Sequence, residues 1–284
     1  MMVGNIFLNH VYTDFKIISN IKNDYDKCIY GEMIMQLTDK AKDNRDKVLP
    51  YYESELNETD PEFMELFNNF LFDEVQQNTL LPERSRMMIT LATLIANQSL
   101  KQYEIALEAA INLGIRPVEI KEVLYQSVAY VGFAKAYDFL DITNQVFDEK
   151  GIDVPLPGQS TTSRENRIER GYEIQIKYFG KEMIEQMNES TPNDQKHFNT
   201  FLQGYCFGDF YTRTGLDDRD RELVTFAILA SLGGCENQLR GHTAGNLSVG
   251  NSRETLIDAV TILMPFIGFP RTLNALSIIN EICR

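Results

Sequence analysis

Apolar side chains recur every three or four positions along most of the chain, a spacing that places them on one face of an α-helix. Runs that alternate apolar and polar residues, as half-buried strands do, are rare. The helices that this pattern predicts cover residues 61–77, 82–97, 100–113, 117–131, 134–148, 164–179, 183–187, 198–212, 221–232 and 235–247. The chain is therefore predicted to be all-α.

One apolar helix ends in an unusual way. Residues 221–232 are followed by two glycines, Gly233 and Gly234, and a further helical run begins at Cys235. A cysteine directly after a helix break lies near the N-terminus of the next helix, where free backbone N–H groups favour the thiolate. Cys235 is therefore a candidate activated thiol.

Two more reactive groups lie in the same segment. His242 follows Cys235 by seven residues, or two helical turns, so both side chains are expected on one face with Gln238 between them. Glu222 precedes the break and reaches this face only if the two helices fold back on each other. Its position inside an apolar helix predicts a partly buried carboxylate that can exchange a proton.

Each of these residues also has a purely structural interpretation. A single cysteine in a helix is often a small core residue, and a single histidine is often a hydrogen-bonded structural group. Glu222 has Arg219 and Arg240 as alternative ion-pair partners. Three reactive groups at one helix break nevertheless favour a site formed by Cys235, His242 and Glu222.

The sequence contains an internal repeat. Residues 78–98 match residues 213–233, and residues 112–140 match residues 248–276. The offset between the copies grows by one residue, so the second copy carries one insertion near its pair of glycines. A repeat of this length predicts two similar structural units.

The organisation that follows is an N-terminal arm and two domains. Residues 151–163 contain two prolines and several serines and threonines, as linkers do. We expect an arm over residues 1–30, a first domain over residues 31–150 and a second domain over residues 164–284.

The two copies differ where the reactive groups lie. Met87 stands opposite Glu222 and Ala106 stands opposite His242, while a serine or a leucine stands opposite Cys235. The first copy therefore keeps the helices without the reactive groups. Neutral drift at surface positions is the alternative, but the joint loss predicts a single site, in the second domain.

Composition narrows the classes of partner. The net charge of −14 disfavours nucleic acids and anionic membranes, which bind basic surfaces. No apolar run approaches the ~20 residues of a membrane span. The four cysteines have no disulfide or metal spacing and no secretory segment opens the chain, so a cytoplasmic protein is expected.

Cofactors are not indicated either. The three histidines do not cluster with cysteines, so no metal site is predicted. No glycine-rich phosphate loop is present, which leaves a small-molecule substrate as the expected partner.

Long motifs now point to a family. The segments FGDFYTRTGLDDRDRELVTFAILASLGGCENQLRGHTAGNLSVG and PFIGFPRTLNAL in the second half, and PERSR, GIRPVEIKEVLYQ and YVGFAKA in the first, resemble the carboxymuconolactone decarboxylase family. This family also contains the alkylhydroperoxidase D-type proteins. The resemblance covers about residues 31–147 and 167–282. It implies two tandem alkylhydroperoxidase D-like helical domains and a homotrimer, in which six domains surround a threefold axis.

The peroxidase branch of this family reduces hydroperoxides with a Cys-x-x-Cys-x-x-x-His motif and an upstream glutamate. Cys235, His242 and Glu222 match that motif, but Gln238 replaces its second cysteine, so no resolving thiol lies one turn away. Cys206 is a substitute only if folding brings it close. This branch gives the alternative function, a hydroperoxide reductase that depends on Cys235.

The decarboxylase branch removes CO2 from a small anionic lactone, which requires a proton donor or acceptor and groups that hold a carboxylate. The QLRGH and GFPRTLNAL segments resemble this branch more closely. His242 and Glu222 would move the proton, with Gln238 beside them. The arginines that are candidates for holding the anion are Arg213, Arg221, Arg240 and Arg271.

The predicted function is therefore acid–base chemistry on a small lactone or carboxylic acid, at one site in the second domain and without a cofactor. Hydroperoxide reduction is the first alternative. A non-catalytic assembly protein with idle site residues is the second.

Overall fold

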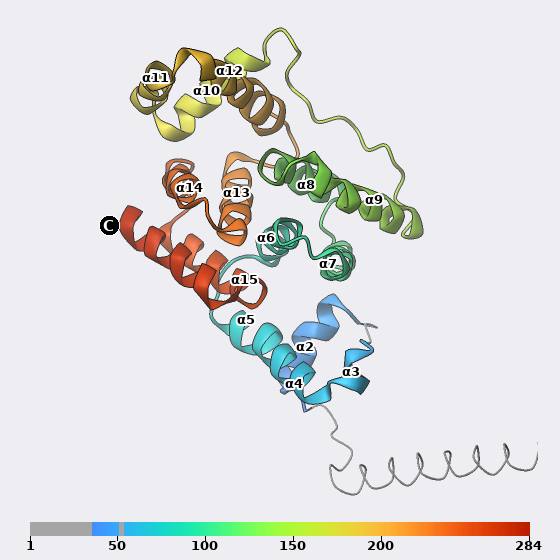
Figure 1. Ribbon diagram of the computed structural model, residues 1–284. Coiled ribbons are helices and arrows are strands. Elements are labelled where there is room, and N and C mark those ends of the chain that lie inside the picture. The colour runs from blue at the N-terminus through green and yellow to red at the C-terminus, as the bar shows by residue number, and fades with distance from the viewer. Residues whose placement is uncertain (1–35, 51–53) are drawn as a thin grey trace, which may run out of the picture.

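A computed structural model describes residues 36–50 and 54–284, and these residues form helices without a strand (Figure 1). The all-α prediction is confirmed. The predicted N-terminal arm, residues 1–30, lies outside the described residues.

Two series of helices follow each other along the chain. The first consists of α2 (Asp39–Val48), α3 (Leu56–Thr59), α4 (Pro61–Asn69), the π-helix η1 (Phe70–Glu74), α5 (Val75–Gln77), α6 (Glu83–Ala96), α7 (Leu100–Asn112), α8 (Pro117–Val131) and α9 (Phe133–Glu149). The second consists of α10 (Arg167–Phe179), α11 (Lys181–Ser190), the 3-10 helix η2 (Asn193–Gln195), α12 (Lys196–Phe201), the π-helix η3 (Leu202–Tyr211), α13 (Asp218–Leu232), α14 (Glu236–Ser248) and α15 (Arg253–Ile282).

The repeat seen in the sequence is a repeat of structure. Helices α6 and α7 correspond to α13 and α14, and η1 corresponds to η3. Helices α8 and α9 together correspond to α15, because Gly132 with φ of 84° separates the first pair and Gly268 with φ of 73° kinks the long helix. Both glycines adopt a positive φ that other residues avoid.

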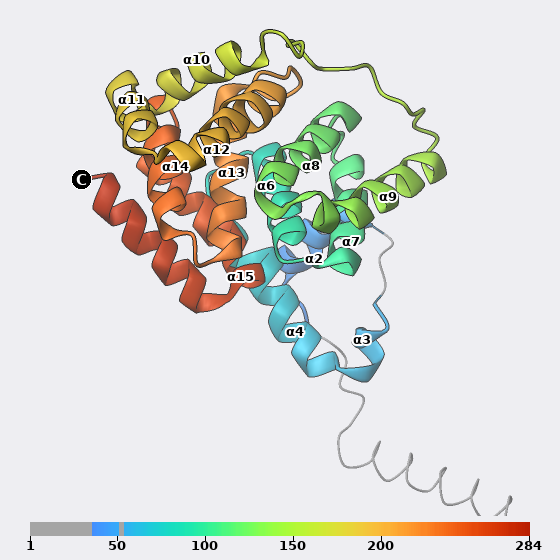
Figure 2. The same cartoon turned by 45° about the horizontal axis from the view of Figure 1, so that its top comes forward.

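The two repeats share one hydrophobic core. Helices α6 and α13 pack against each other at its centre, where the buried Ser231 hydroxyl donates to Thr93 Oγ1 at 3.2 Å. Helix α8 packs on α13, and α15 packs on α6, so each repeat reaches across to the other. Figure 1 shows this exchange, and Figure 2 shows it from a second direction.

By length and composition α15 could cross a membrane, so the prediction that no run approaches that length has one exception. Contacts with α6, α13 and α14 place α15 in the shared core, which accounts for its apolar side chains.

Helix α10 approaches η3 closely through two glycines. A Cβ on Gly171 would lie 1.8 Å from the Gln203 oxygen, and a Cβ on Gly208 would lie 2.1 Å from the Arg167 oxygen. Because neither clash can be relieved by a side-chain rotation, both positions require glycine. This close packing sets where the last residue of α10, Phe179, meets the second repeat.

Candidate active site

Glu222 and His242 meet at the centre of the second repeat. Gly233 and Gly234, with φ of 67° and 71°, turn the chain so that α14 folds back on α13. His242 Nδ1 then lies 3.0 Å from Glu222 Oε2 and 3.1 Å from Oε1. The predicted return of the second helix onto the first is confirmed, and Glu222 pairs with neither of the arginines considered for it.

This contact fixes the tautomer of the histidine. A carboxylate only accepts hydrogen bonds, so Nδ1 carries the proton and Nε2 keeps a lone pair. Nε2 faces the hydroxyl of Tyr130, on α8 of the first repeat, at 3.5 Å. The Tyr130 and Tyr211 hydroxyls are 2.5 Å apart, and Tyr211 lies 2.8 Å from Thr225 Oγ1. A row of hydroxyl groups thus leads away from the reactive nitrogen.

Burial keeps these phenols protonated. It raises the pKa of Tyr130 and of Tyr211 well above the ordinary value of 10, since a phenolate is poorly solvated there. Both hydroxyls therefore remain hydrogen-bond donors at neutral pH. Burial also raises the pKa of the neighbouring Cys206 thiol to about 12, so that thiol is not a reactive group.

An aromatic ring covers the histidine. The Phe179 and His242 rings meet edge to face, with centroids 5.3 Å apart and planes at 89°. Gly245 makes this possible, because a Cβ there would lie 2.4 Å from Glu222 Oε2 and 3.1 Å from Phe179 Cε1. Asn246 Nδ2 donates to the backbone oxygens of Glu222 and His242 and ties the two helices together. The His242 side chain is 10% exposed.

Two of the predicted anion-binding arginines, Arg213 and Arg221, share one carboxylate as their partner. Glu122, on α8, accepts two hydrogen bonds from Arg213 Nε and one from Arg213 Nη2. It also accepts one from the buried Arg221 at 3.0 Å. Arg221 donates to Gln126 as well, and Gln126 Nε2 donates to Thr225 Oγ1, so these ions border the hydroxyl row. Their guanidinium groups serve the contact between the repeats.

The other predicted binding residues make contacts elsewhere. Arg240 pairs with Glu281, and Arg271 donates to Asn97 Oδ1 at 3.0 Å. Gln238 is exposed. No hydrogen bond among the described residues joins any of these three side chains to His242.

No hydrogen bond between Cys235 and His242 occurs in the described part of the chain. Cys235 is the N-cap of α14, with φ of −129°, and so precedes the first helical residue, where the two-turn helical spacing to His242 no longer applies. Its thiol donates to the Leu229 oxygen at 3.3 Å. Burial, and to a lesser degree Glu236, raise the pKa of this thiol, whereas Arg271 lowers it. This direction is opposite to the one expected of an activated thiol and fits the alternative of a packed cysteine.

Sequence reasoning missed the aromatic residues of the site. Tyr130 and Phe179 contact His242, and Tyr211 contacts Tyr130. Tyr130 and Tyr211 lie in segments that carry the family resemblance, but neither was singled out as a site residue. The alignment of the two copies held a signal for these two tyrosines, since Tyr130 stands opposite Phe266 and Tyr211 opposite Gln76. Nothing comparable marks Phe179, whose position depends on the packing of α10.

Comparisons with known proteins agree with the repeat. The model of the carboxymuconolactone decarboxylase family matches residues 61–145 and residues 197–281. A 4-carboxymuconolactone decarboxylase from Acinetobacter baylyi is 25% identical over 118 residues, which cover 42% of this chain and 87% of that protein. A crystal structure from Burkholderia xenovorans, described as a gamma-carboxymuconolactone decarboxylase subunit, aligns with a TM-score of 0.50 and 18% identity, over 85% of this chain and 95% of that one. The structural likeness is one of fold.

Proposed function

Because the chain belongs to the carboxymuconolactone decarboxylase family, we propose that its second repeat decarboxylates a small lactone carboxylate with Glu222 and His242. The observation that carries the proposal is the buried Glu222–His242 contact at 3.0 Å, which leaves Nε2 of the imidazole as the proton-transferring atom. The relative from Acinetobacter baylyi is a decarboxylase by name, which supports the class of reaction.

Decarboxylation of a lactone carboxylate consumes one proton. The bond between the ring carbon and the carboxylate breaks, CO2 leaves, and the electron pair stays on the carbon and spreads towards the lactone carbonyl. A proton must then be added to this carbanion, at the carbon that held the carboxylate or at the carbon conjugated with it. His242 takes up this proton from solvent at Nε2 before the reaction and so becomes an imidazolium. Nε2 then delivers the proton to the substrate, and Glu222 stabilises the imidazolium from which it comes.

The developing negative charge needs donors that are already in place. Tyr130 and Tyr211 supply them, because their raised pKa values keep both hydroxyls protonated. Since Tyr130 belongs to the first repeat, the site uses residues of both repeats.

Substrate entry requires one side chain to move. Phe179 lies over His242 at the end of α10, directly before Gly180, whose φ of 85° ends the helix. Rotation of the Phe179 ring would expose the imidazole, and its return would exclude water during the reaction.

Hydroperoxide reduction has less support. Cys235 has a raised thiol pKa, and Cys206, the candidate resolving thiol, lies in a separate cluster with Tyr178, Phe207 and Tyr211. The homotrimer and the cytoplasmic location remain proposals from family resemblance and composition. Light scattering would test the first with a molar mass of three chains.

The test is decarboxylation of γ-carboxylated lactones by the purified protein, followed by CO2 release and by lactone absorbance. His242→Gln should lower kcat by about 10²- to 10⁴-fold, since it removes the transferable proton. Glu222→Gln should lower kcat by a similar factor, because the carboxylate no longer holds the proton of His242 on Nδ1.

Cys235→Ser is the control and should keep its turnover. Turnover by His242→Gln at the wild-type rate would overturn the proposal, and loss of hydroperoxide reduction in Cys235→Ser would favour the alternative.

A further inference from the structure

The first repeat holds a cavity of about 320 Å³ at the position where the second repeat holds its polar site. Met87 and Ala106, the counterparts of Glu222 and His242, both line it. Phe266 of α15 closes it from the other repeat, as Tyr130 of α8 does in the second repeat. The volume lies within the range of pockets that hold small organic molecules.

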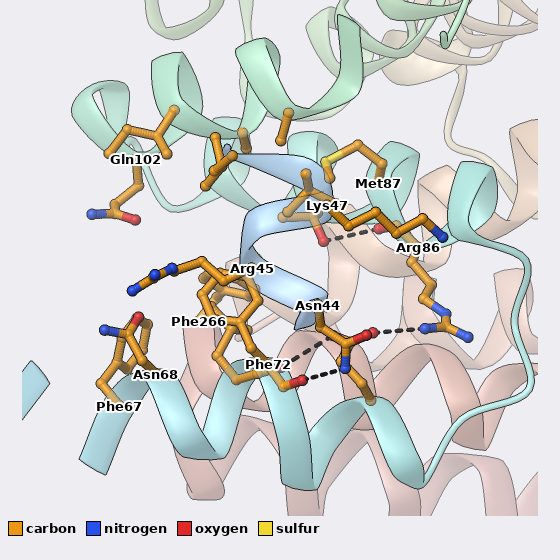
Figure 3. A pocket seen from close by; sticks show the side chains of 18 of the residues that line it. Asn44, Arg45, Lys47, Phe67, Asn68, Phe72, Arg86, Met87, Gln102 and Phe266 are labelled. Atoms are coloured by element: carbon orange, nitrogen blue, oxygen red, sulfur yellow. Dashed lines mark hydrogen bonds between the residues drawn. The ribbon is translucent and has the colours of Figure 1, made fainter. Parts of the chain in front are cut away.

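The wall of this cavity is mostly apolar. Helix α2 crosses its mouth, between α7 on one side and the α4–η1–α5 segment on the other, and presents Asn44, Arg45 and Lys47 (Figure 3). Arg45 pairs with Asp46, and Lys47 pairs with Glu83, so these two cations are neutralised at the rim. The interior offers hydrocarbon side chains to a ligand.

Arg86 differs from the other charged residues that line this cavity. Its Nε donates to the Leu81 oxygen at 2.5 Å and its Nη1 donates to Gln76 Oε1 at 2.6 Å, and both acceptors are neutral. Within the described residues its Nη2 makes no hydrogen bond, and no carboxylate pairs with this guanidinium. Arg86 therefore brings an uncompensated positive charge to an apolar cavity.

The equivalent arginine of the second repeat has a carboxylate partner that Arg86 lacks in the part of the chain that the structure describes. Arg221, the counterpart of Arg86, pairs with the carboxylate of Glu122. The counterpart of Glu122 is Asp258, which instead accepts from the backbone nitrogen of Leu80 at 2.7 Å. A carboxylate brought by a ligand would give Arg86 the kind of partner that Arg221 has from the protein.

We propose that the first repeat binds a small apolar monocarboxylate in this cavity, with the carboxylate on Arg86 and the hydrocarbon part against Met87, Ala106 and Phe266. About ten water-sized groups fit the volume, which corresponds to a chain such as octanoate. The cavity has lost the acid–base pair of the second repeat, so this is a binding site without catalysis.

The test is isothermal titration calorimetry of the full chain with octanoate, 3-phenylpropanoate and uncharged octan-1-ol. At least one of the two carboxylates should bind with Kd below about 1 mM. Arg86→Gln should raise the Kd of that carboxylate by about tenfold or more, because one charge-assisted hydrogen-bond pair is lost. The Kd of octan-1-ol should not change. Arg86→Lys should restore part of the affinity.

Three further variants test whether the binding is specific to this cavity. Ala106→Phe fills the cavity and should abolish binding of the acid and of the alcohol, with a melting temperature that shows the fold is intact. His242→Gln should bind as wild type does, which separates this site from the proposed catalytic one. Arg170→Gln removes an exposed arginine that pairs with Glu173 and should also change nothing.

Failure of both carboxylates to bind at 10 mM would overturn the proposal. So would binding that Arg86→Gln leaves unchanged, or binding that His242→Gln abolishes.

Discussion

The two repeats use the same helices to build opposite interiors. In the second, Glu222 and His242 fill the centre with hydrogen-bonded polar groups. In the first, Met87 and Ala106 take those positions and leave a cavity of about 320 Å³. A buried carboxylate is tolerated only with partners, so the acid and the histidine have to be kept or lost together.

The repeats also depend on each other. The centre of the second is completed by Tyr130 from α8, and the centre of the first by Phe266 from α15. The first repeat thus contributes to the proposed chemistry although it lacks the reactive pair. One copy can therefore lack its own acid and histidine while its helix α8 forms part of the proposed site.

The most drastic way to erase the difference is to give the second repeat the residues of the first. A Glu222→Met, His242→Ala protein should lose about 10³-fold or more in kcat for lactone decarboxylation. The loss should be little larger than in either single variant, because the two side chains act as a unit. Glu254→Met, which changes an exposed carboxylate, is the matched control. Additive losses from the two single variants would show independent roles.

The charged layer between the repeats can be tested in matched positions. Glu122→Gln leaves Arg213 and Arg221 without their carboxylate, and the free energy of unfolding should fall by about 3–5 kcal/mol in urea titrations. Asp258→Asn, at the equivalent position, weakens one hydrogen bond to a backbone nitrogen and should cost about 1 kcal/mol. Equal losses in the two variants would contradict this assignment.

Much of this difference could be predicted from the sequence. The helices and the repeat follow from local periodicity. The contact of Glu222 with His242 was one of the possibilities, because the two glycines allow the chain to fold back, while Arg219 and Arg240 stayed open as other partners of the carboxylate. The change to Met87 and Ala106 is visible in the alignment, and it marked the second copy as the one with a site.

Other parts of the site depend on packing that no local pattern encodes. Tyr130 reaches His242 because α8 crosses to the second repeat, and Phe179 does so because glycines bring α10 down on η3. Arg213 is neutralised by Glu122, which lies 91 residues away in the chain. The role of Cys235 as the N-cap of α14 could not be fixed from the sequence, because one position decides whether a residue caps a helix or belongs to its first turn.

The two repeats also differ at Gly245, where the backbone approaches Glu222 and Phe179 closely. Its counterpart is Ala109, which has a methyl group where the second repeat has none. Gly245→Ala should cost about 1–3 kcal/mol of unfolding free energy, because the new Cβ would lie 2.4 Å from Glu222 Oε2. Decarboxylation should fall as well, since the carboxylate is displaced from His242. Ala109→Gly serves as the reverse change and should leave turnover unaltered, and an unstrained Gly245→Ala protein would refute the packing argument.

Lys121 marks a smaller difference, since its counterpart in α15 is Ile257. Burial lowers the pKa of its ammonium group to about 8, and its only polar partner among the described residues is Asn144 Oδ1 at 2.6 Å. Lys121→Ile should therefore raise stability at pH 7 by about 1–2 kcal/mol.

The pH dependence follows from linkage. Between pH 8 and the ordinary lysine value of about 10.4 the unfolded state binds more protons than the folded one, so wild-type stability rises with pH in that window. The advantage of Lys121→Ile should shrink across the same window in thermal melts. Lys101→Ile, at an exposed position of α7, should show no such trend, and a constant advantage from pH 7 to 10 would contradict the assigned cause.

The smallest expected effect concerns Cys235. Only the second repeat has a thiol at this position, and we expect that thiol to be unreactive at neutral pH. In a variant whose other three cysteines are serine, the pH dependence of alkylation by iodoacetamide reports the pKa of this thiol. Burial and the neighbouring Glu236 should place the midpoint above the ordinary value of about 8.5, so alkylation at pH 7 is slow. Glu236→Gln should lower the midpoint slightly, because it removes a nearby negative charge. A midpoint below about 7 would mean that the helix N-terminus outweighs burial, and the second repeat would then differ from the first by an activated thiol as well as by its acid–base pair.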